Sequence, residues 1–431
     1  MKKRLISVLL SLTMAAGLLA GCGYSGGPGD GGADSDGSSG EETVLTVWSI
    51  STESDAFHPA YLRAIEEFEE SHPGVKIQFE TFENESYKTK IKSAVAANEL
   101  PDVFFTWGGG FSKLFVESGK VLDLDSYYGD YSDALPETVL NNATYDGKLY
   151  GSVFTTPVSV IFYNKVMFEA QGLEVPTTWD EWKNVCQTFL DAGITPIGTS
   201  VKDTWVLAMT HDAMVLKSAG PEKLQSTLLR ESGSYEDADF LNAVEKLKEL
   251  ADMGAFSESA DGLTNDEASA DFYAGNVAMY TTGSWMAGSI QRDAENPEDF
   301  GVMPVPVLNE DNARITDFMG GPSDTLMASA SSANPDLAAA AVFELTKAIS
   351  QYSYLDGAGI PAWKIDYDDS SVNALTKEVA DYAANATSFT LWYDILMEAE
   401  DASEYLALLQ ELYMGYITPE EFTKAMAKRL E

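Results

Sequence analysis

The fold is decided by the stretch from Val44 to Phe105, which reads VLTVWSISTESDAFHPAYLRAIEEFEESHPGVKIQFETFENESYKTKIKSAVAANELPDVFF. It opens with a β-rich run at 44–48, and residues 57–71 then carry apolar side chains at helical spacing. A His-Pro-Gly turn ends that helix, and a strand, a second helix and a short apolar strand follow. Strand, helix, strand, helix, strand in this order predicts βαβ units and a mostly parallel sheet.

A second α/β region follows further along the chain. Residues 158–163 are strand-like, and the capping box Thr178-Trp179-Asp180-Glu181 predicts the start of a helix that runs to Gly193. A helical face over 240–251 and strands at 277–281 and 300–305 come next. The pair Asn334-Pro335 predicts another helix start, and a capping box at 418–421 begins the last helix of a mostly helical tail.

The first residues have the pattern of a bacterial export signal. Lys2, Lys3 and Arg4 precede an apolar run that ends in Leu18-Leu19-Ala20-Gly21-Cys22. This run is too short for a good membrane-spanning helix, so we expect 1–21 to be a signal peptide and Cys22 to become a lipid-modified N-terminus. Ordinary secretion, with Cys22 left as a spare thiol, is the alternative. Residues 22–43 are rich in Gly, Ser, Asp and Glu and predict a flexible acidic tether, and we expect an extracytoplasmic protein anchored to the outer face of the cell membrane.

The composition limits the possible partners. The chain has 27 basic and 68 acidic residues, a formal net charge of −41. Such a surface repels phosphate backbones, so nucleic acid is not an expected partner and phosphorylated ligands are disfavoured. Neutral and cationic ligands remain open. The length remaining after processing suffices for two domains, and we expect a monomer.

The residue types needed for most enzymes do not form a recognisable motif. Gly108-Gly109-Gly110 lacks the lysine and spacing of a phosphate-binding loop, and His211-Asp212 has no nucleophile motif beside it. Cys186 lies on a helical pattern and is expected to be a core thiol, and the three histidines have no metal-ligand spacing. Any two acids could form a glycosidase pair, but the sequence selects none. We therefore expect no catalysis, no cofactor and no metal.

Tryptophans at strand ends are the more informative feature. Trp107 follows a predicted strand, Trp285 follows a glycine turn after another strand, and Trp48 ends the first strand. Ligands of open α/β sheets bind outside these strand ends, where a flat indole suits the C–H face of a sugar ring. Trp363 and Trp392 in the C-terminal part are further candidates. The alternative is that each tryptophan is a partly buried packing residue, which is how we interpret Trp179 and Trp182.

A set of short motifs in fixed order resembles the extracellular solute-binding protein family 1, the sugar-binding lipoproteins of ABC importers such as the maltodextrin-binding proteins. The motifs cover nearly the whole chain after residue 43. They are Leu45-Thr46-Val47-Trp48-Ser49, Pro101-Asp102-Val103-Phe104-Phe105, Gly147-Lys148-Leu149-Tyr150-Gly151, Phe162-Tyr163-Asn164-Lys165, Pro176-Thr177-Thr178-Trp179-Asp180-Glu181, Phe272-Tyr273-Ala274-Gly275-Asn276-Val277-Ala278-Met279, Gly283-Ser284-Trp285 and Gly320-Gly321.

The resemblance implies a two-lobe periplasmic-binding-protein-like (type II) α/β fold with a hinge and an interlobe cleft. One lobe would take 44–155 plus 312–358, and the other 156–311 plus 359–431. Gly320-Gly321 would be either a turn on the hinge side or a place where backbone approaches ligand.

The resemblance also implies ligand-binding residues. Trp107, Trp285 and Trp392 match aromatic positions that stack on sugar in relatives, and Trp205 lies near a further cleft position. Ser51, Glu53 and Asp55 follow the first strand, where relatives place polar sugar contacts. One departure is that maltodextrin-type relatives carry a carboxylate near Thr155-Thr156-Pro157 where this chain has none, so maltose itself is not expected.

The function we expect is binding without chemistry. A neutral carbohydrate, an oligosaccharide in the first instance, would bridge the lobes, stabilise the closed state and be delivered to the transmembrane subunits of an ABC permease. A polyamine or a cationic peptide in the same cleft is the first alternative. A surface glycoside hydrolase is a second, and an adhesin without lobe closure is a third.

Overall fold

The computed structural model describes residues 42–431. The predicted signal peptide, the lipidation site Cys22 and the tether up to residue 41 lie outside the described residues. Among the residues that are described, no helix is both long and apolar enough to cross a membrane.

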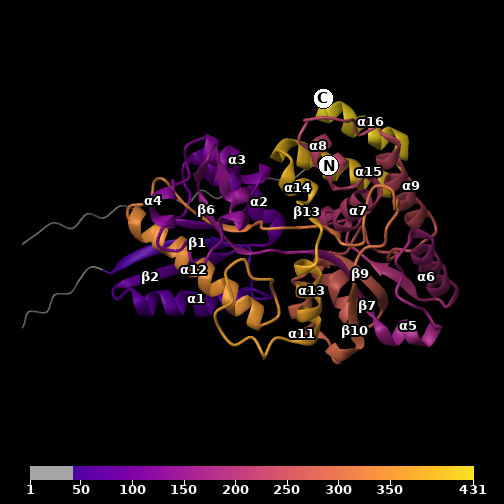
Figure 1. Ribbon diagram of the computed structural model, residues 1–431, viewed down its shortest axis with the longest axis horizontal. Helices are drawn as coiled ribbons and strands as arrows, with labels where there is room; N and C mark the ends of the chain where they lie inside the picture. The colour runs from indigo at the N-terminus through magenta and orange to yellow at the C-terminus, as the bar shows by residue number, and fades with distance from the viewer. Residues whose placement is uncertain (1–41) are drawn as a thin grey trace, which may run out of the picture. The chain divides into compact units, whose positions relative to one another are not determined.

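The first sheet has five strands in the order β2-β1-β3-β12-β6 (Figure 1). β1 runs parallel to both β2 and β3, as the strand-helix-strand pattern predicted, whereas β12 is antiparallel to both β3 and β6. The last two strands were not predicted from the sequence. The bounds are β1 Thr43–Ser49, β2 Val75–Thr81, β3 Val103–Trp107, β6 Gly151–Thr155 and β12 Asp324–Ala328.

Amphipathic helices cover the first sheet. Helix α1 buries Tyr61, Ala64 and Phe68, which lie three or four residues apart and therefore on one face. It packs against α12, a helix from much later in the chain that begins with the predicted Asn334-Pro335 start. The elements around this sheet are α1 His58–Ser71, α2 Asn84–Ala97, α3 Gly110–Glu117, α4 Asp125–Tyr128, β4 Thr144–Tyr145, β5 Lys148–Leu149 and α12 Pro335–Leu355.

The second sheet has four strands in the order β10-β7-β9-β8, in which β8 and β9 are parallel and β7 is antiparallel to its two neighbours. Both predicted capping boxes are present, Thr178 with Glu181 and Thr418 with Glu421. The bounds are β7 Ser159–Asn164, β8 Thr195–Gly198, β9 Val277–Gly283, β10 Phe300–Met303, α5 Lys165–Gln171, α6 Trp179–Asp191, α7 Thr204–Ala219, α8 Pro221–Leu228, α9 Ala238–Asp252, α10 Asn265–Tyr273 and α11 Met286–Asp293.

The C-terminal segment packs largely against the helices of the second sheet. Helix α15 contacts α7 and α9, and α16 contacts α9 (Figure 1). Buried Asp212 ties this segment down, since its carboxylate accepts hydrogen bonds from the Tyr405 hydroxyl and from the Tyr393 N–H. The remaining bounds are β11 Asp317–Met319, α13 Ala374–Ala384, β13 Ser388–Thr390, α14 Tyr393–Leu396, α15 Ala399–Tyr413 and α16 Pro419–Leu430, and β11 pairs in parallel with β13.

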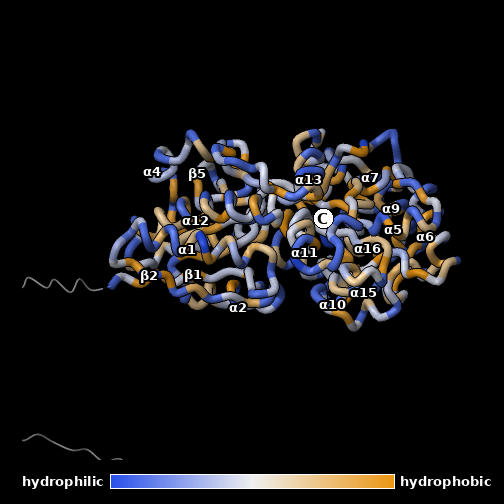
Figure 2. The backbone as a smooth tube through the Cα atoms, turned by 90° about the horizontal axis from the view of Figure 1, so that it is seen from below, coloured by the Kyte–Doolittle hydropathy of each residue, from blue (hydrophilic) through white to orange (hydrophobic). Residues whose placement is uncertain are grey.

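Buried hydrophobic residues pack around both sheets. Figure 2 shows apolar residues, in orange, along the chain in both halves of the view. Cys186 on α6 is fully buried, as predicted, and burial raises the pKa of its thiol to about 12. A thiol that stays protonated in an apolar core is inert, so Cys186 is a packing residue.

Three chain segments connect the two sheets and hydrogen-bond to one another. They contain Thr156-Pro157, Gly320-Gly321 and Ile360. The Gly321 N–H donates to the Pro157 carbonyl at 2.9 Å, and the Thr156 N–H donates to the Ile360 carbonyl at 2.9 Å. Gly320 has a φ of +132°, and a Cβ there would lie 2.2 Å from the Pro157 oxygen. The glycine pair is therefore required by the close approach of two connecting segments, which favours the hinge-side interpretation of Gly320-Gly321.

Candidate ligand-binding site

A cavity of about 1230 Å³ opens between the ends of the strands of the two sheets. From the first sheet it is lined by the loop after β1, by residues 83–85 after β2, and by the ends of β3, β6 and β12. From the second sheet it is lined by the end of β7 and the start of α5, by the loops after β8 and β9, and by α10 and α11. The carboxyl ends of β1 and β3 lie at this edge, as expected for a ligand site on an open α/β sheet. The volume exceeds the roughly 300–1,000 Å³ of ordinary small-molecule pockets, so several linked rings fit.

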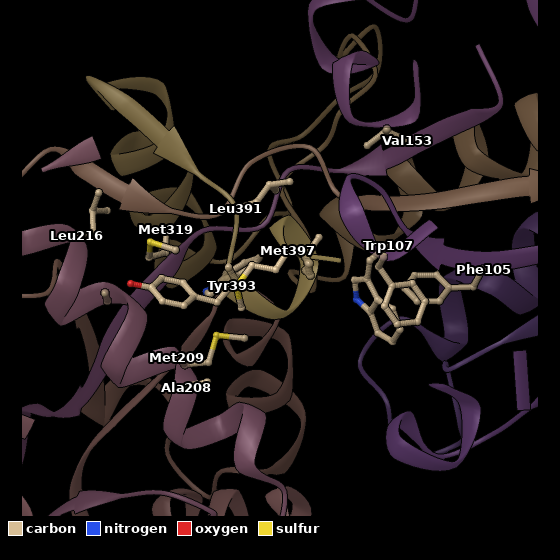
Figure 3. Close-up of a cluster of buried hydrophobic side chains, with 14 of the residues drawn as sticks. Phe105, Trp107, Val153, Ala208, Met209, Leu216, Met319, Leu391, Tyr393 and Met397 are labelled. Carbon is tan, nitrogen blue, oxygen red and sulfur yellow. The ribbon is translucent and has the colours of Figure 1, made fainter. Parts of the chain in front are cut away.

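Trp107 lies on the first-sheet side of the cavity. It is the last residue of β3 and is only 8% exposed. Phe105 and Phe111 hold its ring edge-on at centroid distances of 4.9 and 5.0 Å. Figure 3 shows Trp107 beside Phe105. The Lys88 ammonium lies 5.3 Å from the centroid of the same ring. An indole fixed in this way offers a preformed surface at little entropic cost.

Trp205 and Trp285 lie on the second-sheet side. Their ring centroids are 6.4 Å apart and both side chains are partly exposed in the cavity. Gly283 makes room for Trp285, because a Cβ on Gly283 would lie 2.0 Å from the indole ring. The Gly-Ser-Trp turn noted in the sequence thus allows the indole to fold back over its own strand end.

The polar part of the cavity is predominantly acidic. Asp55 from the first sheet accepts hydrogen bonds from the Ser51 hydroxyl at 2.9 Å and from the Phe57 N–H at 2.8 Å. Burial raises its pKa against the effect of these two bonds. Asp324, the first residue of β12, accepts a hydrogen bond from the Thr155 hydroxyl at 2.8 Å, and burial, reinforced by the charge of Asp55, raises its pKa to about 6. Glu83 also has a raised pKa, from burial and from the negative charges of Asp266 and Asp203.

Arg292 is the one basic residue among the described residues that line the cavity. Its guanidinium binds Asp293 through two hydrogen bonds and donates a third, at 2.8 Å, to the carbonyl of Ser54. The Ser54 hydroxyl donates to Asp266 at 3.3 Å. Ser54 belongs to the loop after β1, whereas Asp266 and Arg292 lie on α10 and α11, so these bonds join the two sides of the cavity mouth.

The structure brings six of the sequence-predicted site residues together and separates three. Ser51, Glu53, Asp55, Trp107, Trp205 and Trp285 line the cavity, but Trp48, Trp363 and Trp392 do not. Trp363 is 4% exposed and its indole N–H donates to the Val153 carbonyl at 3.1 Å, so it is a core residue of the first sheet. Trp48 packs edge-on against Phe82, under the Lys90 ammonium. Trp392 is 2% exposed, with its ring 6.2 Å from that of Trp285.

Three further residues of the cavity were missed by sequence reasoning. Tyr61 is one of the residues at helical spacing in the helix predicted over 57–71, and Asp324 and Arg292 carried no motif. Only the antiparallel pairing of β12 with β3 places Asp324 opposite Trp107, and a strand far along the chain gives no local sign of its partner. Among the described residues no cluster of three or more histidines, cysteines or acids could hold a metal ion.

Residues 54–352 match the sequence profile of the bacterial extracellular solute-binding proteins. The chain belongs to this family. An uncharacterized ABC transporter extracellular-binding protein of Pyrococcus horikoshii, PH1039, is 26% identical to this solute-binding protein over 295 residues, 66% of this chain and 68% of the relative. The multiple sugar-binding protein of Streptococcus mutans is 25% identical over 235 residues, 53% of this chain and 55% of the relative. These matches span about half to two thirds of the relatives' length.

Solved structures extend the likeness of this solute-binding protein over nearly the whole described chain. One, from work on xylan utilization by the thermophilic bacterium Caldanaerobius polysaccharolyticus, has a TM-score of 0.87 and 36% identity, and covers 90% of this chain and 100% of that one. A chitin oligosaccharide binding protein has a TM-score of 0.83 at 24% identity, covering 91% and 98%. The predicted two-lobe α/β fold and the predicted family are thereby confirmed.

Proposed function

We propose that this solute-binding protein captures a neutral oligosaccharide in the cavity and delivers it to an ABC permease. The observation that carries the proposal is the placement of Trp107 on one side of a single cavity and of Trp205 and Trp285 on the other. Indole rings suit the apolar faces of sugar rings, and the Asp55 and Asp324 carboxylates accept hydrogen bonds from hydroxyls. The solved structure with 36% identity comes from work on xylan utilization, which makes a plant-type oligosaccharide a first probe.

The mechanism that we propose is closure of two lobes around the ligand without chemistry. Lobe 1 comprises 44–155 and 312–358, and lobe 2 comprises 156–311 and 359–431. The bonds from the Ala362 N–H to Phe154 and from the Lys364 N–H to Ala134 favour moving residues 360–364 to lobe 1. The three hydrogen-bonded connecting segments act as the hinge, and the ligand stabilises the closed state because it contacts both lobes there. An affinity near micromolar, about −8 kcal/mol, is expected.

The location that we propose is extracytoplasmic, with a monomer held at the membrane by lipid on Cys22. The relatives include ABC transporter extracellular-binding proteins and the lipoprotein LipO of Bacillus subtilis, which is 26% identical over 48% of this chain and 40% of the relative. Palmitate labelling that is lost in Cys22→Ser would support the anchor. Labelling that persists in the variant would contradict it.

The binding test is calorimetric titration of the purified protein with xylotriose, cellotriose, maltotriose and chitotriose. At least one trisaccharide is expected to bind and to raise the melting temperature by mass action. If none binds at millimolar concentration, the proposed function is wrong. Release of reducing ends from these trisaccharides would instead indicate a glycoside hydrolase.

A cationic ligand, such as a polyamine or a basic peptide, is the second candidate, and the acidic lining of the cavity favours it. The two candidates differ in their response to salt. Binding of spermidine would weaken steeply with ionic strength, because charge attraction is screened, whereas binding of a neutral trisaccharide would change little.

A further inference from the structure

Three side chains from separate elements on the first-sheet side line the cavity. They are Asp55 in the loop after β1, Tyr61 on α1 and Asp324 at the start of β12. The charges of Asp324 and Asp55 raise the pKa of Tyr61, and the charge of Asp55 raises the pKa of Asp324. They therefore form one electrostatically coupled cluster.

Tyr61 is an unexpected member of this cluster, because its buried hydroxyl donates no hydrogen bond. The side chain is 1% exposed, yet its hydroxyl has no hydrogen-bond partner within the described residues. The Ser49 hydroxyl is close enough to lower the Tyr61 pKa, which is the effect of a donor, so the Tyr61 proton stays unused. Buried hydroxyls nearly always have a partner, since an unpaired one costs desolvation energy. A group that lines a cavity and lacks a protein partner is well placed to donate to a ligand.

The carboxylates of Asp55 and Asp324 are held in place by hydrogen bonds from the protein, and each can accept further hydrogen bonds. The Oδ1 of Asp55 accepts from Ser51 and Phe57, and the Oδ2 of Asp324 accepts from Thr155. The second oxygen of each carboxylate has no hydrogen-bond donor within residues 42–431. A carboxylate oxygen can accept further hydrogen bonds but cannot donate one while it is ionised. The cluster therefore combines one free donor with two free acceptors.

Within residues 42–431, no basic side chain hydrogen-bonds to Asp55 or Asp324. Arg292 acts on Asp55 only through space, while its hydrogen bonds go to Asp293 and to the Ser54 carbonyl. A ligand group next to Asp55 and Asp324 must therefore be uncharged or cationic, because like charges brought together in a desolvated site cost several kcal/mol.

We propose that Asp55, Tyr61 and Asp324 form an anchor subsite that holds one sugar ring through neighbouring hydroxyls and rejects a ring that carries a carboxylate. The subsite makes the protein selective for neutral saccharides over uronic-acid-containing ones. This inference rests on the proposed function and narrows its substrate class.

The test compares neutral and acidic saccharides on the wild type and on two variants. The neutral probes are xylotriose, cellotriose, maltotriose and chitotriose, and the acidic probes are trigalacturonate and glucuronosyl-xylotriose. Arabinosyl-xylotriose controls for the bulk of a branch without its charge. The wild type is expected to bind the best neutral probe at least about a hundredfold more tightly than either acidic one.

The variants separate charge from hydrogen bonding. Tyr61→Phe removes the free donor and is expected to weaken neutral binding roughly tenfold without changing the preference for neutral over acidic probes. Asp324→Asn keeps the shape of the side chain but removes its charge. It is expected to weaken the binding of neutral probes by about tenfold or more, and to reduce the preference for neutral over acidic probes by about tenfold. Tyr235→Phe and Asp401→Asn alter buried residues that do not line the cavity and are expected to leave both quantities unchanged.

The outcomes distinguish the two proposals. If a neutral trisaccharide binds, but Tyr61→Phe and Asp324→Asn retain full affinity or an acidic probe binds equally well, the anchor subsite is wrong while the proposed function stands. If no neutral probe binds, both are wrong.

Discussion

Trp107 and Asp324 are direct cross-strand partners, the last residue of β3 facing the first residue of the antiparallel strand β12. This pairing places an indole and a carboxylate side by side at the edge of the sheet that meets the cavity. A stacking surface and a hydrogen-bond acceptor thus come from neighbouring strands on one rigid scaffold, although about half of the chain lies between them in sequence.

Removing the indoles on either side of the cavity should weaken binding without unfolding the protein. Trp107→Ala and Trp285→Ala are each expected to lower the affinity for the best neutral trisaccharide by at least about tenfold, because each removes an aromatic contact worth about 1 kcal/mol beyond its buried area. Calorimetric titration measures the change. Two variants with wild-type affinity would show that the ligand does not contact these rings.

Trp363→Phe should lower the stability of the protein and leave its ligand affinity unchanged. It removes the indole donor of a buried carbonyl, Val153 O, so the free energy of unfolding is expected to fall by about 1–3 kcal/mol. The affinity should stay unchanged, because Trp363 lies in the core of the first sheet. Chemical denaturation measures the stability and titration of the same preparation measures the affinity. A large loss of affinity in a folded variant would mean that Trp363 does contribute to the binding site.

Gly283→Ala tests the packing behind Trp285. A methyl group would collide with the indole ring at 2.0 Å, so the ring must move from its place in the cavity. The expected loss of affinity is roughly tenfold, or about 1.4 kcal/mol. Gly254→Ala, on a turn without nearby atoms, changes a glycine outside the cavity and should not alter binding. Unchanged affinity in Gly283→Ala would mean that the ring position is not needed.

The ionised carboxylate of Asp324 should lower the free energy of unfolding, by an amount that depends on pH. Its folded-state pKa of about 6 lies above the ordinary aspartate pKa of 3.8, so burial of its charge destabilises the folded state above pH 6. This destabilisation disappears as pH falls through 6 towards 3.8. The Thr155 hydroxyl hydrogen-bonds to the carboxylate, and Asp55 and Tyr61 are the titratable groups that interact with it. Asp324→Asn is therefore expected to raise the free energy of unfolding at pH 8 by about 2–3 kcal/mol.

The comparison across pH supplies the control for this effect. Asp324→Asn should raise the free energy of unfolding only slightly at pH 4, because the wild-type carboxyl is largely protonated there. Denaturation at the two pH values measures the difference. A variant that is destabilised at pH 8, or equally stabilised at both, would contradict the raised pKa.

Arg292 should govern the lifetime of the complex. Its bond to the Ser54 carbonyl joins the two sides of the cavity mouth, so Arg292→Ala is expected to raise the ligand dissociation rate roughly tenfold with less change in the association rate. Arg429→Ala, which removes the ion pairs of α16 with Glu400, Asp401 and Glu404 on α15, is the matched control. Stopped-flow tryptophan fluorescence resolves the two rates, and equal dissociation rates would exclude a role in closure.

Local patterns predicted the elements and part of the site. The capping box at Thr178, the helical spacing of α1 and the alternating run of β2 are encoded within a few residues, and the sequence therefore predicts them directly. The same holds for Trp107 and Trp285, which lie at the ends of recognisable strands. Gly320-Gly321 was recognisable as unusual, but only its contact with Pro157 distinguishes a hinge-side turn from a ligand contact.

What the sequence could not predict depends on pairing between distant segments. Asp324 reaches the cavity only because β12 lies between β3 and β6. Trp363 looked like the other late tryptophans, but its segment hydrogen-bonds to β6 and is buried there. Tyr61 fitted the core face of its helix so well that its free hydroxyl gave no sign in the sequence.

A crystal structure of the protein with its best-binding neutral trisaccharide tests the central claim most directly. We expect sugar rings against Trp107 on one side and Trp285 on the other, with ring hydroxyls bonded to Asp55, Tyr61 and Asp324. A saccharide bound elsewhere, or one that contacts neither indole, would contradict the account.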